Sequence, residues 1–214
     1  MDIPNEVAVM TLANETLFPQ ALLPLYIYEP RYRQMLAESL HTHRMFVVAM
    51  QRQGFSRESP SLVAGLGLVR VCVDNPDGTS HLILQGISRV EVTKTIRHKP
   101  FRISRIRMLT TPARDSSAIN ALMTKLRDLV TERVRQGFKT HPDAPKAHSI
   151  KGMVTYLNKL HDPDQAADLI TSALLPRPDE RQMILETIEI EPRLRYLIHF
   201  LMAEISQHRK NKTK

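Results

Sequence analysis

Histidine and cysteine are the side chains of this sequence that could act as nucleophiles, bases or metal ligands. The chain has nine histidines and a single cysteine, Cys72. His41 and His43 flank Thr42 at the expected end of a helix, where an imidazole interacts favourably with the terminal carbonyl groups. Cys72 lies between two valines in an expected strand, a pattern typical of a small buried hydrophobic side chain. We therefore expect structural roles for these residues, and no metal ion, cofactor or catalytic residue among them.

The sequence patterns that mark common enzyme classes are also missing. There is no G-x-x-x-x-G-K-[ST] loop, and with only seven glycines no phosphate-cradling loop is apparent. There is no G-x-S-x-G, H-E-x-x-H or C-x-x-C pattern either. An enzyme whose catalytic residues are far apart in the sequence stays open as an alternative, ranked after the two binding functions described below. Catalytic groups are defined by geometry and not by their order along the chain. The sequence favours a binding protein.

An apolar corner near the N-terminus is the first candidate binding surface. Residues 17–28 are mostly apolar but contain Pro19 and Pro24. Proline lacks an N–H group and fixes φ, so neither can lie inside a central paired strand, and we expect a short edge strand. Pro30 suits the first position of a helix, which should cover residues 30–40.

An exposed apolar corner with a charged rim is the expected form of a site for unfolded or extended peptides. Strand alternation should send only some of the corner's side chains inward and leave the others on the surface. Burial of all of them in a core is the simpler alternative. The candidate peptide-binding residues are Leu22, Leu23, Tyr26, Tyr28, Glu29, Arg31 and Tyr32.

A basic segment is the second candidate surface. Between residues 94 and 107 there are six basic residues and no acidic one: Lys94, Arg97, Lys99, Arg102, Arg105 and Arg107. A basic strand could follow a phosphate backbone, which makes RNA or DNA binding the alternative function. Aromatic residues make up only 5% of the chain and tryptophan is absent, so platforms for base stacking are scarce. Edge strands also carry Lys and Arg to prevent aggregation.

Charge and composition set the class of protein. The net charge of +8 favours anionic partners, although part of it lies in residues 208–214, which we expect to be a disordered basic tail. There is no apolar run of the ~18 residues that a membrane span needs, and no secretory signal. One cysteine excludes an internal disulfide framework. We expect a soluble cytoplasmic protein without a membrane partner, and the sequence leaves its oligomeric state open.

The first half of the chain has the pattern of short strands. Expected strands cover residues 7–12, 45–50, 62–73, 81–84, 87–94 and 101–109, with Gly86 separating the fourth from the fifth. The run at 45–50 is continuously apolar, which indicates a strand buried on both faces. Residues 74–78 end in Asp-Gly, a strong hairpin turn signal. Six short strands and one helix favour a small barrel or sandwich.

The second half has the pattern of helices. An apolar stripe indicates one helix from residue 119 to about 134, and further helices should cover 146–160 and begin near 163 and 178. The last helix carries a stripe of six residues, namely Leu194, Leu197, Ile198, Leu201, Met202 and Ile205. We therefore predict an α+β protein with a β-barrel subdomain at 1–112, a helical bundle at 113–207 and the tail at 208–214.

Three stretches carry a family resemblance. Residues 17–32 read LFPQALLPLYIYEPRY, residues 77–90 read DGTSHLILQGISRV, and residues 167–194 begin with ADLIT and end with EIEPRL. Together they resemble the signatures of the LON substrate-binding domain family, the N-terminal module of Lon-type ATP-dependent proteases, which also occurs alone. Gln20 stands where that family commonly has glycine, and Val90 where it commonly has an aromatic residue.

The resemblance implies a PUA-like β-pseudobarrel followed by a helical bundle. It also implies a non-catalytic, standalone protein, since the ATPase and serine–lysine peptidase modules of full-length Lon enzymes are not in this sequence. Such a domain would bind unfolded or extended polypeptides through an apolar surface between barrel and bundle. It would act as an adaptor or a holding surface, with a protease or a chaperone as a further partner.

Overall fold

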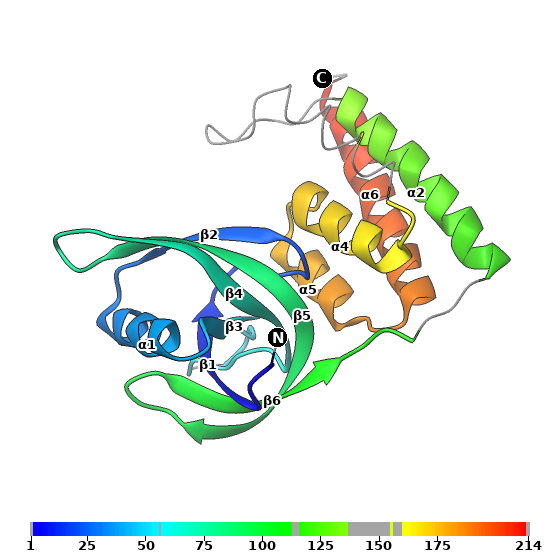
Figure 1. Ribbon diagram of the computed structural model, residues 1–214. Coiled ribbons are helices and arrows are strands. Elements are labelled where there is room, and N and C mark those ends of the chain that lie inside the picture. Colours follow the sequence, from blue (N-terminus) through cyan, green and yellow to red (C-terminus); the bar gives the residue numbers. More distant parts are fainter. Residues whose placement is uncertain (1, 56, 113–115, 137–154, 156–159, 213–214) are drawn as a thin grey trace. The chain divides into compact units, whose positions relative to one another are not determined.

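The structure is a computed structural model that describes residues 2–55, 57–112, 116–136, 155 and 160–212 (Figure 1). The chain divides into two compact units, Met1–Thr110 and Thr111–Lys214. The helix expected at residues 146–160 falls almost wholly outside the described residues.

The first unit is a six-stranded mixed sheet with one helix. Its elements are β1 (Glu6–Leu12), β2 (Leu22–Ile27), α1 (Pro30–His41), β3 (Met45–Met50), β4 (Val63–Asp74), β5 (Ser80–Arg97) and β6 (Arg102–Leu109). The strand order is β2-β5-β4-β3-β1-β6, and an additional β5–β6 pairing closes the sheet into a barrel (Figure 1). The β1–β3 pair is parallel and the other pairs are antiparallel.

The expected edge strand and the helix after it are confirmed. β2 contains Pro24 and stands at the end of the strand order, and α1 begins at Pro30. The expected hairpin turn is also confirmed, since Gly78 has a φ of 79° and the Asn75 N–H donates to the Thr79 carbonyl over 2.8 Å.

Gly86 does not separate two strands as the sequence suggested. β5 runs unbroken for 18 residues and pairs with β2 near its start and with β6 near its end. The glycine is needed for close packing, because a Cβ atom there would lie 1.9 Å from the carbonyl oxygen of Phe18. A register shift in the β4–β5 pairing falls beside it, between Leu66 and Gly67.

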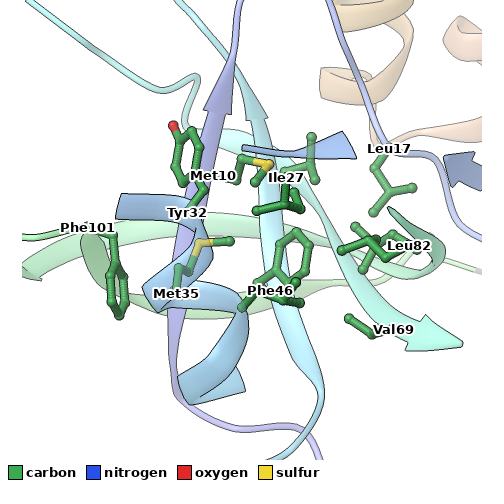
Figure 2. Packing of buried hydrophobic residues seen from close by; sticks show 13 residues of the cluster. Met10, Leu17, Ile27, Tyr32, Met35, Phe46, Val69, Leu82 and Phe101 are labelled. Atoms are coloured by element: carbon green, nitrogen blue, oxygen red, sulfur yellow. The ribbon is translucent and has the colours of Figure 1, made fainter. Parts of the chain in front are cut away.

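The barrel buries apolar side chains on both faces of β3, as expected. Phe46 and Val48 join one cluster, and Met45, Val47 and Ala49 join a second. Figure 2 shows the first cluster, which collects side chains from the strands, from α1 and from the corner before β2. The labelled members are Met10, Leu17, Ile27, Tyr32, Met35, Phe46, Val69, Leu82 and Phe101.

The described part of the second unit consists of helices. They are α2 (Ser117–Arg135), α4 (Pro163–Leu174), α5 (Pro178–Glu186) and α6 (Ile190–Lys212). Helix α2 is capped by the Ser116 hydroxyl, which accepts a hydrogen bond from the Ile119 N–H. Helices α4 and α5 begin at prolines, where the sequence placed them.

A buried arginine links three segments of the second unit. Arg193 of α6 has no exposed surface, and its guanidinium donates to Asp164 of α4 over 2.5 Å and to Thr111 over 3.0 Å. Asp168 lies 3.6 Å away. A buried guanidinium needs several partners, so this set fixes the start of the unit against α4 and α6.

The C-terminal helix extends into the segment that the sequence assigned to a basic tail. Helix α6 continues to Lys212, so residues 208–212 are helical and not disordered. The ring of His208 contacts the Gln136 carbonyl at 3.2 Å, and Arg209 forms an ion pair with Glu132. The last turns of α6 therefore have partners in α2 and in Gln136, the residue that follows it.

Candidate peptide-binding surface

Strands β2, β5 and β4 carry apolar side chains on the face that points away from the core. The register places Tyr26 opposite His81 and His81 opposite Val73. The next row across the same strands is Pro24, Ile83 and Val71. We call this surface the outward face, and its residues are Leu22, Pro24, Tyr26, Val71, Val73, His81 and Ile83.

Strand alternation explains why these side chains are exposed. Leu82, Leu84 and Ile27 point to the opposite face and are buried in the core. On the outward face, Leu22 is 63% exposed and Val73 is 57% exposed. The expectation that the apolar corner sends only some side chains inward agrees with this arrangement.

The outward face contains an open groove with an aromatic end. The groove has a volume of about 430 Å³ and is lined by Pro24, Leu25, Tyr26, Val71, Val73, His81, Leu82 and Ile83. The ring of Tyr26 stacks on His81 at 4.7 Å and on Tyr28 at 5.8 Å between centroids. The Tyr26 hydroxyl donates to Thr79 Oγ1 over 3.2 Å, which holds the ring in place. A groove of this size can take a few apolar side chains of an extended chain.

The charged rim beyond Tyr28 is an ion-pair cluster. The guanidinium of Arg31 donates to Glu29 Oε2 over 2.9 Å and also binds Glu58. Partial burial lowers the pKa of Arg31, but the hydrogen bonds with Glu58 and Glu29 outweigh that effect and raise the pKa above its usual range. Two carboxylates therefore share one guanidinium, and the cluster carries one net negative charge.

Two of the sequence-predicted site residues face the core. Tyr32 is 5% exposed, and its hydroxyl donates to the Thr11 carbonyl and accepts from the Thr11 N–H, both at 3.1 Å. Burial raises the pKa of Tyr32. Leu23 is half-buried and packs against the same core cluster. Neither residue belongs to the outward face, whereas Leu22 and Tyr26 do and Tyr28 adjoins it.

Five residues of the outward face were not among the sequence candidates, namely Pro24 of β2 and four others. Val71, Val73, His81 and Ile83 come from the β4–β5 hairpin, which the sequence did predict. The missing step was the pairing of β2 with β5, which joins residues 22–27 to residues 80–85. Alternation within each predicted strand was the available signal, but it does not say which strands become neighbours.

The basic segment forms a hairpin, made of the end of β5 and the start of β6, and we call residues 94–107 the basic hairpin. Arg97 pairs with Glu38 at 3.1 Å, Arg105 with Glu6 at 3.0 Å and Arg107 with Glu91 at 2.6 Å. The guanidinium of Arg102 donates to Thr95 Oγ1 and to the Glu58 carbonyl, both over 3.1 Å. Lys94 and Lys99 are exposed.

Cys72 is half-buried, not fully buried as expected, and its Sγ lies 3.7 Å from Asp74 Oδ1. Burial and the nearby carboxylate raise the pKa of the thiol, which disfavours the reactive thiolate. Among the described residues, no group of three or more His, Cys, Asp or Glu side chains could hold a metal ion. In the same part of the chain, no helix combines the length and the apolar character that crossing a membrane requires.

The fold and the family comparison agree on the class of protein. The family model of the ATP-dependent protease La (LON) substrate-binding domain matches residues 6–203. The chain therefore belongs to the LON substrate-binding domain family, and the resemblance seen in the sequence is confirmed.

Curated relatives of the chain are Lon proteases. The Lon protease 2 of Herpetosiphon aurantiacus is 29% identical over 205 residues, which are 94% of this chain and 24% of that protein. The Lon protease of Phenylobacterium zucineum is 27% identical over 207 residues, which are 95% of this chain and 25% of that protein. The chain thus spans about a quarter of the length of these relatives, and the matching quarter is the non-catalytic substrate-binding domain.

Solved structures of Lon N-terminal domains share the fold. The N-terminal domain of the Mycobacterium avium complex Lon protease matches with a TM-score of 0.73 and 16% identity, over 92% of this chain and 98% of the other. The Lon N-terminal domain protein from Xanthomonas campestris matches with a TM-score of 0.65 and 17% identity, over 91% and 98%. The expected α+β class with a PUA-like fold is confirmed.

Proposed function

We propose that this protein binds protein substrates as extended polypeptide segments on the outward face of β2, β5 and β4. The family gives it a substrate-binding role. The observation that carries the finer proposal is a continuous apolar face with two stacked tyrosines that stays exposed beside a well-packed core. Exposed apolar patches of this kind mark sites for protein ligands.

The proposal assigns binding to side chains on the face and not to the backbone at the sheet edge. The Gly86 N–H donates to the Ala21 carbonyl over 2.9 Å, so that carbonyl and, two residues further on, the backbone groups of Leu23 point toward β5. By alternation, those of Leu22, Pro24 and Tyr26 point to the free edge. Pro24 has no N–H group, so a peptide added as a further strand would lack its central partner. Binding through apolar contacts avoids that loss.

The expected interaction is weak and broad in sequence. Apolar burial is not directional, and the groove offers only a few side-chain positions. We expect a dissociation constant on the order of tens of micromolar, as for small transient interfaces. Weak, unspecific binding suits an adaptor or a holding surface that presents unfolded cytoplasmic polypeptides to a protease or a chaperone.

Fluorescence anisotropy with a permanently unfolded, labelled polypeptide tests the proposal. Leu22→Asp and Val73→Asp each place a carboxylate on the outward face, where the ligand would have to desolvate it. We expect each variant to weaken binding about tenfold or more. Ile96→Asp is the matched control, because Ile96 is 45% exposed on β5 but lies outside the outward face.

Unchanged melting temperatures would show that the variants remain folded, since the replaced side chains are exposed. Equal affinity of all three variants and the wild type would exclude the outward face as the binding surface. Loss of binding in Ile96→Asp alone would point to the basic hairpin instead.

Nucleic-acid binding by the basic hairpin is the competing function. Three of its arginines are paired with carboxylates, which reduces the positive charge that phosphate groups could use. Salt separates the two functions, because phosphate contacts lose affinity steeply as salt rises, whereas apolar peptide binding changes little.

A further inference from the structure

The outward face has opposite charges at its two ends. Arg70 stands at the end next to Leu22, and Asp77 stands at the end next to Tyr26. Between them lie the apolar rows described above. A ligand along this face would therefore meet a cation at one end and an anion at the other.

A break in strand regularity places Arg70 on this face. The β4–β5 register shifts between Val69 and Val71, so Arg70 and Val71 are both exposed in succession. Bulges of this kind re-aim a side chain. The Arg70 Nε donates to Gln85 Oε1 over 2.5 Å, and Gln85 pairs with Leu22 in the register. The amide is neutral, so the guanidinium keeps its charge for a ligand.

A hydrogen-bond chain connects Asp77 to the aromatic end of the groove. The Tyr26 hydroxyl donates to Thr79 Oγ1, and Thr79 Oγ1 in turn donates to Asp77 Oδ1 over 2.7 Å. Hydrogen bonds from the Thr79 hydroxyl and N–H lower the pKa of Asp77, with a smaller contribution from the charge of Arg33. The carboxylate is therefore ionised at neutral pH. The Arg33 guanidinium lies against the same turn, 1.9 Å from where a Cβ atom of residue 78 would stand, and the cluster of Glu29, Arg31 and Glu58 beyond Tyr28 carries one net negative charge.

We propose that the outward face selects extended segments whose apolar residues are flanked by an acidic residue, which lies at Arg70, and a basic residue, which lies at Asp77. This inference rests on the proposed function and names the substrate class of the same surface. From Arg70 to Val73 the strand advances about 10 Å at ~3.3 Å per residue, and Asp77 lies further on in the turn. The two ligand charges should therefore stand roughly four to six residues apart.

Three labelled peptides with the same apolar centre of about five residues test this selection. Their flanking residues are Lys and Glu, Lys and Lys, or Glu and Glu. Exposed ion pairs are weak, so we expect the mixed peptide to bind about two- to fivefold more tightly than either like-charged peptide at low salt. The preference should disappear at 1 M salt, where the Debye screening length is about 3 Å.

Charge reversal at Arg70 gives the sharper result. With Arg70→Glu both ends of the face are acidic, so the Lys/Lys peptide should become the best ligand and the mixed peptide should lose its advantage. Lys125→Glu on α2 makes the same change in net charge and should leave the wild-type order intact. Asp77→Asn, which keeps a hydrogen-bonding side chain in the turn, should reduce the advantage of the mixed peptide over the Glu/Glu peptide.

The outcomes separate this inference from the proposed function. Equal binding of the three peptides that is still lost in Val73→Asp would overturn the charge selection and leave the binding surface in place. No binding of any peptide would overturn the proposed function itself. An unchanged order of affinities in Arg70→Glu would also refute the selection, because it would show that the ligand does not reach Arg70.

Discussion

The outward face and the basic hairpin both lie on β5, but they differ in how their side chains are accommodated. Arginines of the hairpin form ion pairs within the protein, whereas apolar side chains of the outward face are exposed to water. The basic hairpin has three arginines that meet carboxylates of the same unit, two of them in cross-strand pairs, Glu6 with Arg105 and Glu91 with Arg107. Such pairs satisfy charge locally and stabilise the sheet a little. On the outward face, Val71, Val73 and Leu22 are more than half exposed, so their apolar surface remains in contact with water.

This comparison indicates which of the two surfaces would gain more free energy by binding a partner. An ion pair between exposed groups is worth about 0–1 kcal/mol, and a phosphate that replaces a carboxylate partner recovers little of it. Exposed apolar surface gains about 25 cal/mol for every Å² that a ligand covers. Net charge alone would have favoured the basic hairpin, whereas the pairing of its arginines favours the outward face.

Among the substitutions considered, we expect the largest loss of stability at Gly86, which packs against the corner that leads into β2. In Gly86→Ala the new methyl group would overlap the Phe18 carbonyl, so the corner before β2 must move. We expect a loss of about 3 kcal/mol in the free energy of unfolding, and weaker peptide binding because β2 is displaced. Chemical denaturation and anisotropy measure the two effects.

Gly54→Ala is the matched control for this substitution. Gly54 has a φ of 81° and open space around its Cα, so alanine there costs about 1 kcal/mol from backbone strain alone and should not affect peptide binding. Equal destabilisation by both substitutions would mean that the contact at Gly86 is not what holds the corner in place.

A smaller effect is expected when the arginines of the basic hairpin are released. The triple variant Glu6→Gln, Glu38→Gln, Glu91→Gln removes three carboxylate partners and keeps the side-chain shapes. We expect a stability loss of about 1–2 kcal/mol, since each exposed pair contributes about 0.2–1 kcal/mol. Binding of single-stranded RNA should become stronger and steeper in its salt dependence, with a slope increase of about 0.7 for each phosphate newly contacted.

Peptide binding should be unchanged in this triple variant. If the wild type already bound RNA as tightly as the variant, with the same salt slope, the carboxylates would not be what masks the basic hairpin. The conclusion that ion pairing makes the basic hairpin the weaker binding surface would then be wrong.

Local patterns predicted most of the fold. Continuous apolar residues marked the doubly buried β3, Asp-Gly marked the hairpin turn, and prolines marked the starts of three helices. The interpretation of Gly86 was wrong because glycine inside a strand pattern indicates either an end or a close approach. Only the position of Phe18, 68 residues earlier in the sequence, distinguishes the two.

Two of the seven residues of the outward face, Leu22 and Tyr26, were among the sequence candidates. The exposed part of the corner followed from proline placement and strand alternation. The partners of that corner did not, because the β2–β5 pairing joins segments separated by more than 50 residues. Tyr32 is a different case, because its helical spacing with Met35 and Leu36 already indicates a buried face. Its hydroxyl also bonds to the Thr11 backbone, a contact that the sequence does not reveal.

The smallest expected effect concerns Gln20, which has a φ of 64° at the corner before β2. A left-handed backbone costs a residue with a Cβ about 1–2 kcal/mol, whereas glycine adopts it freely but loses more entropy on folding. Gln20→Gly should therefore raise the free energy of unfolding by about 0.5 kcal/mol. Peptide affinity should not change, because the Gln20 N–H still donates to the Gly86 carbonyl and β2 stays in register. A tighter peptide complex in this variant would show that the corner moves when ligand binds, and that the outward face is not rigid in the free protein.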